Sequence, residues 1–312
     1  MVRPLRDFER LDPGLFRAFL AAAETLNFTR AAEKAGMTQS GVSQHISKLE
    51  SLLDAPLFTR SNKSVLLTDA GKQLVLYIES YLDAMDEFCE RLQSGERTLQ
   101  GNVSYAMPSS CLLSPHLSEM LNKRKEFSGI ELRILIRSND EIVRGLLDGI
   151  YDFGFVTRTY DLPGLDLIPF CDEELVFVAP SGMEIKGLEI GDIVAAEFVT
   201  YPGIDVYFDL WQRHYFPKVK NRCFEALNVK GHIESIHGAI TLVAGGTGCS
   251  VMPVHCIDKE LAKQSILIHR PDVKKAPLLN RIHIATLAGR VATRRAQQVM
   301  DWFFAMHPEV ER

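Results

Sequence analysis

Residues 38–53 have the sequence TQSGVSQHISKLESLL, which separates at helical spacing into an apolar and a polar face. The apolar side chains recur at intervals of four, three and four residues and are expected to point at a core: Val42, Ile46, Leu49 and Leu53. The opposite stripe carries hydroxyls and amides, with a lysine nearby: Gln39, Ser40, Ser43, Gln44, Ser47 and Lys48. Thr38 is the expected N-cap of this helix.

Two further helices are predicted before this segment. Asp12-Pro13 is a typical helix start, and apolar residues follow it at helical spacing. Phe28-Thr29 opens a second helix, with Thr29 as its expected cap and Gly36 at its end. Two helices joined by a short glycine-containing turn form a helix-turn-helix, whose second helix enters the major groove of DNA. The alternative, a polar face that is merely solvated, is disfavoured by this three-helix context.

Residues 56–67 predict a wing of two short strands joined by the polar turn 61–64. Gln can pair with adenine, Ser can contact bases or phosphates, and Arg60 and Lys63 suit phosphates or the minor groove. The candidate DNA contacts are Thr29, Thr38, Gln39, Ser40, Ser43, Gln44, Lys48, Arg60 and Lys63. Residues 28–66 contain five Lys/Arg and three acidic residues, a net charge of +2. Because this charge is small, one copy should bind DNA weakly, which favours a dimer or larger assembly on repeated half-sites.

Several runs in this region resemble the LysR-type transcriptional regulators: FTRAAE at 28–33, TQSGVSQHI at 38–46, PLF at 56–58 and LTDAG at 67–71. The resemblance implies an α/β multidomain fold, with a winged helix-turn-helix domain at 1–67, a linker helix at 68–97 and an effector-binding domain at 98–312. It implies a cytoplasmic transcription factor that binds double-stranded DNA as a homodimer or homotetramer. RNA polymerase is a further candidate partner, and no membrane partner is expected.

The segment from Thr68 to about Gly95 predicts one long helix capped by Thr68. Its apolar residues are spaced alternately by four and three, which is typical of a heptad seam between paired helices: Leu74, Ile78, Tyr81, Met85, Phe88 and Leu92. The family resemblance also implies that this helix joins two DNA-binding domains. The alternative is a long helix that packs on its own domain.

Strand and helix patterns alternate from residue 101 onward, which favours parallel α/β lobes. The predicted strands are 103–107, 130–137, 153–157, 175–179, 197–201, 250–253, 266–269 and 282–287; the predicted helices are 112–125, 142–148, 206–215, 235–245, 254–263 and 293–306. Ser138 and Glu141 have the spacing of a capping box. The resemblance implies two lobes similar to periplasmic solute-binding proteins, joined by crossing strands near 174–179 and 281–287. Lobe I is then expected at about 101–173 and 281–312, and lobe II at about 174–280.

In such lobes a ligand lies beyond the carboxyl ends of the strands, near helix N-termini. The loops at those places supply hydroxyls, an amide, an imidazole and one guanidinium: Ser109, Ser110, Ser138, Asn139, Thr157, Arg158, Tyr201, Pro202 and His237. Because helix N-termini and Arg158 both favour negative charge, a small polar or anionic effector is expected. For each residue alone, an ordinary cap or turn is the alternative, and Arg158 could face solvent.

The composition excludes several other classes of protein. The chain has 312 residues, 46% hydrophobic residues and a net charge of −5, so it is neither disordered nor coated with basic charge. The charged N-terminus is unlike a signal peptide, and the most apolar stretch, 240–254, is too short to span a bilayer. No catalytic motif, dinucleotide fingerprint or zinc-ligand spacing is present, so no enzyme activity, cofactor or metal is predicted.

Two alternatives to an effector-controlled regulator remain. None of the six cysteines has C-x-x-C spacing, and reduced buried thiols are expected, although Cys111 or Cys249 could serve a thiol-based redox sensor. A small-molecule-binding module without a role in DNA binding is the other alternative, and the absence of a signal peptide disfavours it. An enzyme would require a catalytic constellation that the sequence does not show.

Overall fold

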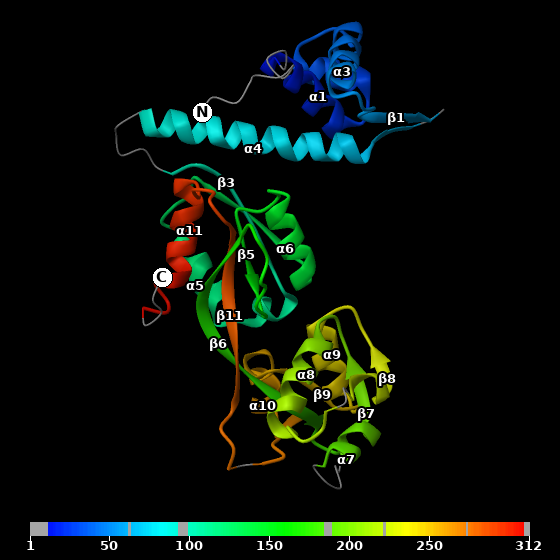
Figure 1. Cartoon of the computed structure of the whole chain (residues 1–312), viewed down its shortest axis with the longest axis vertical. Helices are drawn as coiled ribbons and strands as arrows, with labels where there is room; N and C mark the ends of the chain where they lie inside the picture. Colours follow the sequence, from blue (N-terminus) through cyan, green and yellow to red (C-terminus); the bar gives the residue numbers. More distant parts are fainter. Residues whose placement is uncertain are drawn as a thin grey trace. The chain divides into compact units, whose positions relative to one another are not determined.

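The computed structural model describes residues 12–61, 64–92, 99–183, 189–220, 223–272 and 274–308. The chain divides into two compact units, Met1–Gly95 and Glu96–Arg312. Figure 1 shows the helices and strands of both, coloured along the sequence.

Three helices pack around one apolar core in the first unit, here called the winged unit: α1 (Pro13–Thr25), α2 (Phe28–Ala35) and α3 (Gln39–Leu53). The cap of α3 is confirmed, since Thr38 Oγ1 accepts a hydrogen bond from Gly41 N at 3.1 Å. The apolar face of α3 is confirmed as well: Val42, Ile46 and Leu49 are buried, and Leu53 is half-buried against the same core.

The cap of α2 differs from the prediction. Asn27, not Thr29, is the N-cap, and its Oδ1 accepts from the backbone N–H groups of Thr29 and Arg30 at 2.9 and 3.1 Å. Asn and Thr are both good N-caps, so two neighbouring candidates cannot be separated by residue type alone. Thr29 instead lies exposed in the first turn of the helix.

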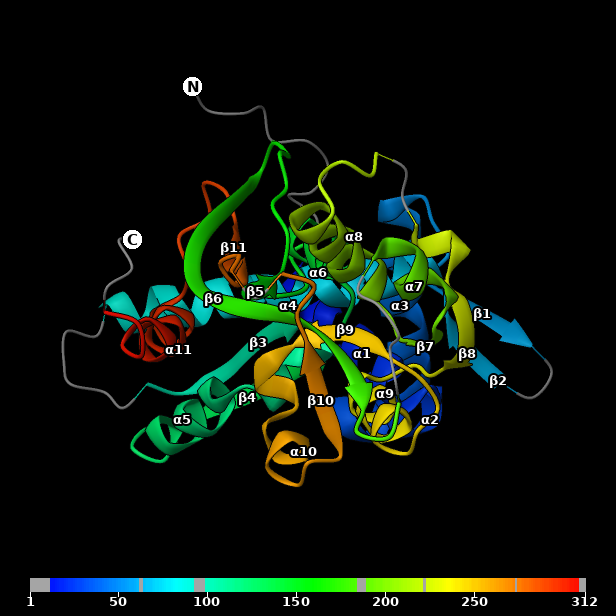
Figure 2. The same cartoon turned by 90° about the horizontal axis from the view of Figure 1, so that it is seen from below.

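The predicted wing is an antiparallel hairpin of β1 (Phe58–Ser61) and β2 (Ser64–Leu67), which Figure 2 shows projecting from the helices of the same unit. Arg60 pairs with Val65 across this hairpin. Lys63 lies outside the described residues. The long helix α4 (Asp69–Leu92) follows, and Thr68 Oγ1 caps it by accepting from Gly71 N at 3.0 Å.

The helix α4 needs a correction to its predicted seam. Leu74 and Ile78 are 7% and 0% exposed because they complete the core of the winged unit, and Tyr81 packs edge-on against Phe16 of α1. These two aliphatic side chains therefore have almost no surface left for a partner helix. Further along α4, Met85 and Phe88 are 42% and 55% exposed. The alternative prediction, packing on its own domain, thus describes the first half of α4.

The second unit, here called the two-lobed unit, alternates strands and helices. Its elements are β3 (Gly101–Met107), the 3₁₀ turn η2 (Ser109–Leu113), α5 (Pro115–Arg124), β4 (Ile130–Ile136), α6 (Asn139–Leu147), β5 (Phe153–Val156), β6 (Leu165–Pro180), α7 (Ile190–Ala195), β7 (Glu197–Thr200), α8 (Ile204–Tyr215), η3 (Phe224–Ala226), β8 (Asn228–His232), α9 (Ile236–Ala244), β9 (Ser250–Pro253), η4 (Val254–Cys256), α10 (Asp258–Ala262), β10 (Ile266–His269), β11 (Leu278–Leu287) and α11 (Arg294–Phe304).

Most of the predicted elements are present, and several differ from the prediction. The predicted helix 112–125 begins only at Pro115, behind η2, and the predicted helix 254–263 is divided into η4 and α10. The short elements α7, η3 and β8 were not predicted. The strand β6 begins ten residues earlier than predicted, at Leu165.

Two long strands join the lobes. β6 pairs antiparallel with β11 from Leu165–Leu287 to Leu175–Leu278, and its far end pairs with β9 and β10. Figure 1 shows both strands running from one lobe into the other. The expectation of parallel lobes holds for β3 with β4 and with β5, and for β7 with β8, whereas the crossing strands are antiparallel. The sheet is therefore mixed.

Each lobe has its own core. In lobe I, α5 and α11 cover one face of the sheet and α6 covers the other, because alternate residues of β3, such as Tyr105 and Ala106, point to opposite faces. In lobe II, α8 and α9 bury Trp211, Phe208 and Ile240 against β6, β7 and β9.

Candidate functional site

The polar face of α3 is accessible to a partner. Gln39, Ser40, Gln44, Ser47 and Lys48 are exposed, and Ser43 is half-buried. Thr38 is exposed too, but its hydroxyl already caps the helix and lies 3.1 Å from Ser40 Oγ. This face therefore presents amide, hydroxyl and ammonium groups beside a helix N-terminus, a chemistry suited to base edges and phosphates.

A carboxylate that the sequence analysis did not single out joins the wing to α3. Glu50 Oε1 accepts from Leu57 N at 2.8 Å and from Phe58 N at 3.4 Å. Phe58 then packs on Phe19 and Phe28 of the core. Glu50 thereby sets the direction in which β1 leaves the C-terminal end of α3.

A second candidate site is a pocket of about 320 Å³ between the two lobes. Seven predicted effector contacts line it: Ser109, Ser110, Ser138, Asn139, Thr157, Tyr201 and Pro202. Two others, Arg158 and His237, are not among its lining residues. The pocket also contains groups that the sequence analysis did not select: Arg137, Glu141, Gly203, Tyr207 and Glu234.

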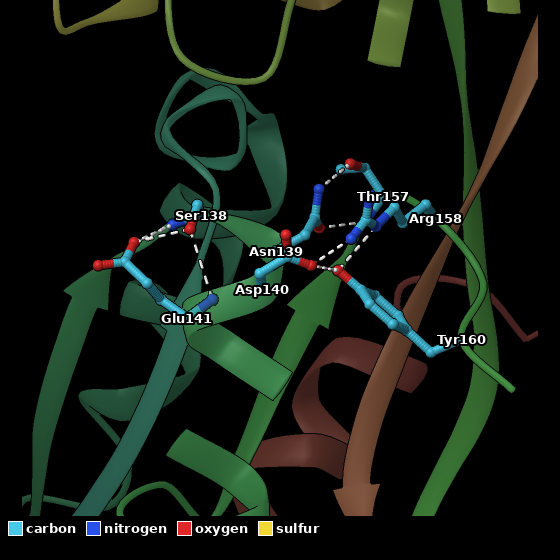
Figure 3. A network of polar contacts seen from close by, with 7 residues as sticks. All are labelled: Ser138, Asn139, Asp140, Glu141, Thr157, Arg158 and Tyr160. Carbon is cyan, nitrogen blue, oxygen red and sulfur yellow. Dashed lines mark hydrogen bonds and ion pairs between the residues drawn. The ribbon is translucent and has the colours of Figure 1, made fainter. Parts of the chain in front are cut away.

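The start of α6 is held by the predicted capping box, shown in Figure 3. Ser138 Oγ accepts from Glu141 N at 3.4 Å, and Glu141 Oε2 accepts from Ser138 N and Ser138 Oγ at 2.9 and 2.7 Å. These hydrogen bonds from Ser138 lower the pKa of Glu141. The carboxylate of Glu141 is therefore used to build the rim of the pocket.

Asn139 and Thr157 fasten α6 to the end of β5 (Figure 3). Asn139 Nδ2 donates to Thr157 Oγ1, and Thr157 N donates to Asn139 Oδ1, each at 2.9 Å. Asn280 Nδ2 donates to Thr157 O at 3.0 Å from the crossing strand β11. The Asn139 amide therefore supports the pocket wall, and its contact with a ligand stays a prediction.

Arg158 requires the main correction at this site. Its guanidinium forms an ion pair with Asp140, its Nε donates to Tyr160 Oη at 2.8 Å, and it lies 4.7 Å from the Tyr160 ring centroid (Figure 3). Tyr160 Oη also donates to Asp140. Asp140 and Tyr160 lie within three residues of predicted site residues, but pairing between them could not be inferred from their spacing. The arginine among the residues that line the pocket is Arg137, which is exposed.

A polar cluster crosses from lobe I to lobe II beside the pocket, and two of its members, Ser110 and Tyr207, line the pocket. Ser110 Oγ lies 3.3 Å from Tyr207 Oη, and Ser110 O lies 3.2 Å from His255 Nε2. Glu173 is 6% exposed beside them, where burial raises its pKa to about 7 against the effect of hydrogen bonds from Asn280 and Tyr207. Ser110 is thus an interlobe contact, and Glu173 is a buried acid that the sequence pattern of a crossing strand did not reveal.

Four of the cysteines that the structure describes do not favour the redox alternative. Burial raises the pKa of Cys171 and of Cys249 to about 12, and it raises the pKa of Cys111 and Cys256 further. A peroxide-reactive or exchange-active thiol needs thiolate character. These four thiols are held in the protonated form.

The folded units agree with the comparisons with known proteins. Residues 14–72 match the family described as bacterial regulatory helix-turn-helix protein, lysR family, and residues 97–307 match the LysR substrate binding domain. A relative from Mycobacterium xenopi, a probable hydrogen peroxide-inducible genes activator, is 28% identical over 55% of this chain and 90% of its own.

Two solved structures share the fold over nearly the whole chain. The crystal structure of ArgP from Mycobacterium tuberculosis has a TM-score of 0.70 at 18% identity and covers 96% of this chain and 98% of that one. The full-length CbnR complexed with its target DNA has a TM-score of 0.62 at 18% identity, with coverages of 95% and 98%.

A winged helix-turn-helix followed by two α/β lobes with a polar pocket between them defines a DNA-binding regulator with an effector domain. The chain belongs to the LysR family of transcriptional regulators. Within the described residues, no helix combines the length and the apolar character needed to cross a membrane.

Proposed function

We propose that this LysR-family regulator recognises DNA through the exposed face of α3 and responds to a small organic anion that enters the interlobe pocket. The observation that carries the effector proposal is the convergence of Arg137, the start of α6 and the start of α8 on one pocket that both lobes line. A ligand that contacts both lobes binds one interlobe geometry better than another, and this difference in affinity shifts the population of states.

The free donors of the pocket, rather than its net charge, favour an anionic group on the effector, since two carboxylates, Glu141 and Glu234, line it beside Arg137. Glu141 is engaged by Ser138, and Glu234 pairs with His232 at 3.1 Å. Arg137 Nη1 donates to Ile136 O at 2.8 Å, and its remaining donors suit a carboxylate in a bidentate arrangement. The backbone N–H groups at the start of α6 and α8 add positive potential.

The DNA proposal assigns base readout to Gln39, Ser40, Ser43 and Gln44, and backbone contact to Thr29, Lys48, Arg60 and Lys63. We expect a dimer or tetramer on a roughly palindromic site, with the exposed part of α4 in the self-contact. Such an assembly in the cytoplasm would control access of RNA polymerase to the promoter. The effector would act by changing the spacing or angle of the paired winged units.

Footprinting of the Gln39→Ala/Ser43→Ala double variant tests the DNA readout. Loss of two base-reading groups should remove sequence preference, because each good base contact contributes about 1–3 kcal/mol of discrimination. Lys48→Ala is the matched contrast, since loss of a phosphate contact should weaken binding evenly across sequences. A footprint of the double variant identical to that of the wild type would refute the assignment.

The effector pocket is tested by comparing two arginines. Thermal-shift titrations with a panel of small carboxylic acids should reveal stabilisation of the wild type, and Arg137→Gln should abolish it. Arg158→Gln should keep it, because the Arg158 guanidinium is already paired with Asp140 and Tyr160. Equal losses in both variants, or none in Arg137→Gln, would contradict the proposed pocket chemistry.

A further inference from the structure

We propose that His116, Cys171 and His307 form a binding site for one transition-metal ion of the zinc class in lobe I. The three side chains come from α5, from the crossing strand β6 and from the segment that follows α11, so they are far apart in the sequence. Their ligand atoms, two imidazole nitrogens and one thiol sulfur, all lie within 4.8 Å of one another. This site is separate from the interlobe pocket that serves the proposed effector function.

The two imidazole nitrogens are slightly closer together than in a tetrahedral site, and all three donor atoms lie within 4.8 Å of one another. His116 Nε2 and His307 Nε2 are 2.6 Å apart. Zinc at about 2.0–2.1 Å from each nitrogen and about 2.3 Å from sulfur requires a nitrogen–nitrogen distance of roughly 3.3 Å. Zinc binding therefore requires the two nitrogens to move apart by roughly 0.7 Å.

The surroundings orient one ligand and shield both rings. Ser114 Oγ lies 2.5 Å from His116 Nδ1, which directs the opposite nitrogen, Nε2, toward His307. A hydrogen bond on the far nitrogen is the usual support of a metal-bound histidine. Phe170 packs edge-on against both imidazoles, with ring centroids 5.1 and 5.0 Å away. Water is therefore partly excluded from the two rings.

The donor set selects the class of ion. Two imidazoles and a thiolate suit Zn²⁺, Co²⁺ or copper, and they do not suit Mg²⁺ or Ca²⁺, which take oxygen ligands. A neutral imidazole ring has a lone pair that can bind an ion. On binding, the Cys171 thiol releases its proton to solvent. The imidazole that donates within the histidine pair moves its proton from Nε2 to Nδ1.

Two of the three ligands line a cavity. His116 and Cys171 line a pocket of about 210 Å³, together with Cys111, Asp172 and His255. Three protein ligands and an open position are typical of zinc sites that bind water or an exogenous ligand. Because Cys171 lies on a strand that joins the lobes, an ion would tie the C-terminal segment to that strand.

Cobalt provides the direct test on the full-length protein, reduced with a phosphine and stripped with EDTA. Titration with Co²⁺ should give one ion per chain, with the ligand-field bands of a tetrahedral site and a thiolate-to-cobalt charge-transfer band. Zn²⁺ should displace the cobalt and raise the thermal midpoint. Cys171→Ser should lose the charge-transfer band, and His307→Ala should weaken zinc binding at least 100-fold.

Two substitutions in lobe II are the controls: Cys223→Ser removes a thiol and His237→Gln removes an imidazole outside the cluster. Both should keep the charge-transfer band and the zinc affinity. A wild type without the band, or wild-type affinity in His307→Ala, would overturn the proposal and leave a hydrogen-bonded histidine pair. If His307→Ala does not fold, the wild-type titration and Cys171→Ser still decide. Neither result depends on DNA or effector binding.

Discussion

Gly71 is the residue at which the start of α4 comes closest to the wing. A Cβ built on Gly71 would lie 2.2 Å from Leu57 O and 2.8 Å from Leu67 Cδ2. Leu57 itself is fully buried, so the backbone cannot move away without disturbing the core. Absence of a side chain is therefore what lets α4 dock beside the wing.

Replacing Gly71 with alanine should destabilise the winged unit. The overpacking cost is typically about 1–3 kcal/mol, which exceeds the gain of up to about 1 kcal/mol for alanine in a helix. Thermal unfolding of the winged unit would measure the loss. Gly14→Ala is the control, because its Cβ would meet only the Asp12 side chain, at 3.2 Å. An unchanged or raised midpoint for Gly71→Ala would show that the contact relaxes.

The single residue Asp152 should make the stability of the two-lobed unit depend on pH. Its carboxylate accepts from Ser104 N at 2.8 Å and from Ser104 Oγ at 3.3 Å. Burial raises its pKa, and the hydrogen bonds from Ser104 and the charges of Arg290 and Arg295 only partly oppose that rise. The folded state therefore binds this proton more tightly than the unfolded state. Protonation of Asp152 contributes its full stabilisation at pH values below 3.8, the pKa of this group in the unfolded chain. This stabilisation is lost as the pH rises through the higher pKa that Asp152 has in the folded protein.

The Asp152→Asn variant should lack this fall in stability. Urea unfolding of the two-lobed unit at a series of pH values from 4 upward, relative to the wild type, gives the difference curve. The free energy of unfolding of the wild type should decline relative to the variant as pH rises over this window. Asp166→Asn, which changes an exposed carboxylate, should follow the wild type. A difference curve that rises with pH would have the wrong sign.

At the scale of the element, helices were predictable because their signals are local. Periodicity and caps gave α3, α4 and α6 close to their observed bounds. The strand β6 was only partly predicted, because its first half, Leu165–Cys171, is held by pairing with β11 more than 100 residues away. The same reasoning explains Arg158 and His307, whose partners are fixed by tertiary contacts that no spacing encodes.

The hydrogen bonds of Glu50 between α3 and the wing lead to a prediction about the orientation of the wing. Replacing Glu50 with alanine removes the acceptor of two backbone N–H groups, and hydrogen bonds to a charged group contribute about 1.5–3 kcal/mol. The winged unit should lose stability of that order, and the wing should lose its fixed direction. Hydrogen exchange at Leu57 and Phe58 should accelerate relative to the wild type.

Glu33→Ala is the matched control, since Glu33 is an exposed carboxylate on α2. Hydrogen exchange at Leu57 and Phe58 in the Glu33→Ala variant should be as slow as in the wild type. Slow exchange retained at Leu57 and Phe58 in Glu50→Ala would mean that the hairpin is held by Phe58 packing alone. The orientation assigned to Glu50 would then be wrong.

At the scale of the whole molecule, the interlobe pocket exists only because distant segments meet. Residues near 109, 138 and 157 come from lobe I, whereas 201 and 207 come from lobe II. The sequence located seven of its lining residues because carboxyl ends of strands follow a general rule. It missed Arg137 and Tyr207 because each lies inside a predicted strand or helix. At such positions the sequence pattern indicates only a residue on one face of the element.

The exposed part of α4 carries the last prediction, about self-assembly. Met85 and Phe88 lie on the same side of α4 as Leu74 and Ile78, at heptad spacing, but beyond the reach of the winged core. The double variant Met85→Gln/Phe88→Gln removes apolar surface without changing charge. It should shift the protein to the monomer in light scattering and weaken operator binding by about 100-fold, because the second winged unit no longer benefits from effective concentration.

The salt dependence of DNA binding separates lost assembly from lost contact. A monomer neutralises half as many phosphates, so the slope of log affinity against log salt should fall to about half of the wild-type value. Leu121→Gln/Leu147→Gln, which removes two exposed leucines from the two-lobed unit, should leave both the mass and the slope unchanged. If the α4 variant stays oligomeric and keeps the full salt slope, the protein pairs through another surface. The two winged units would then be held together by contacts between the two-lobed units.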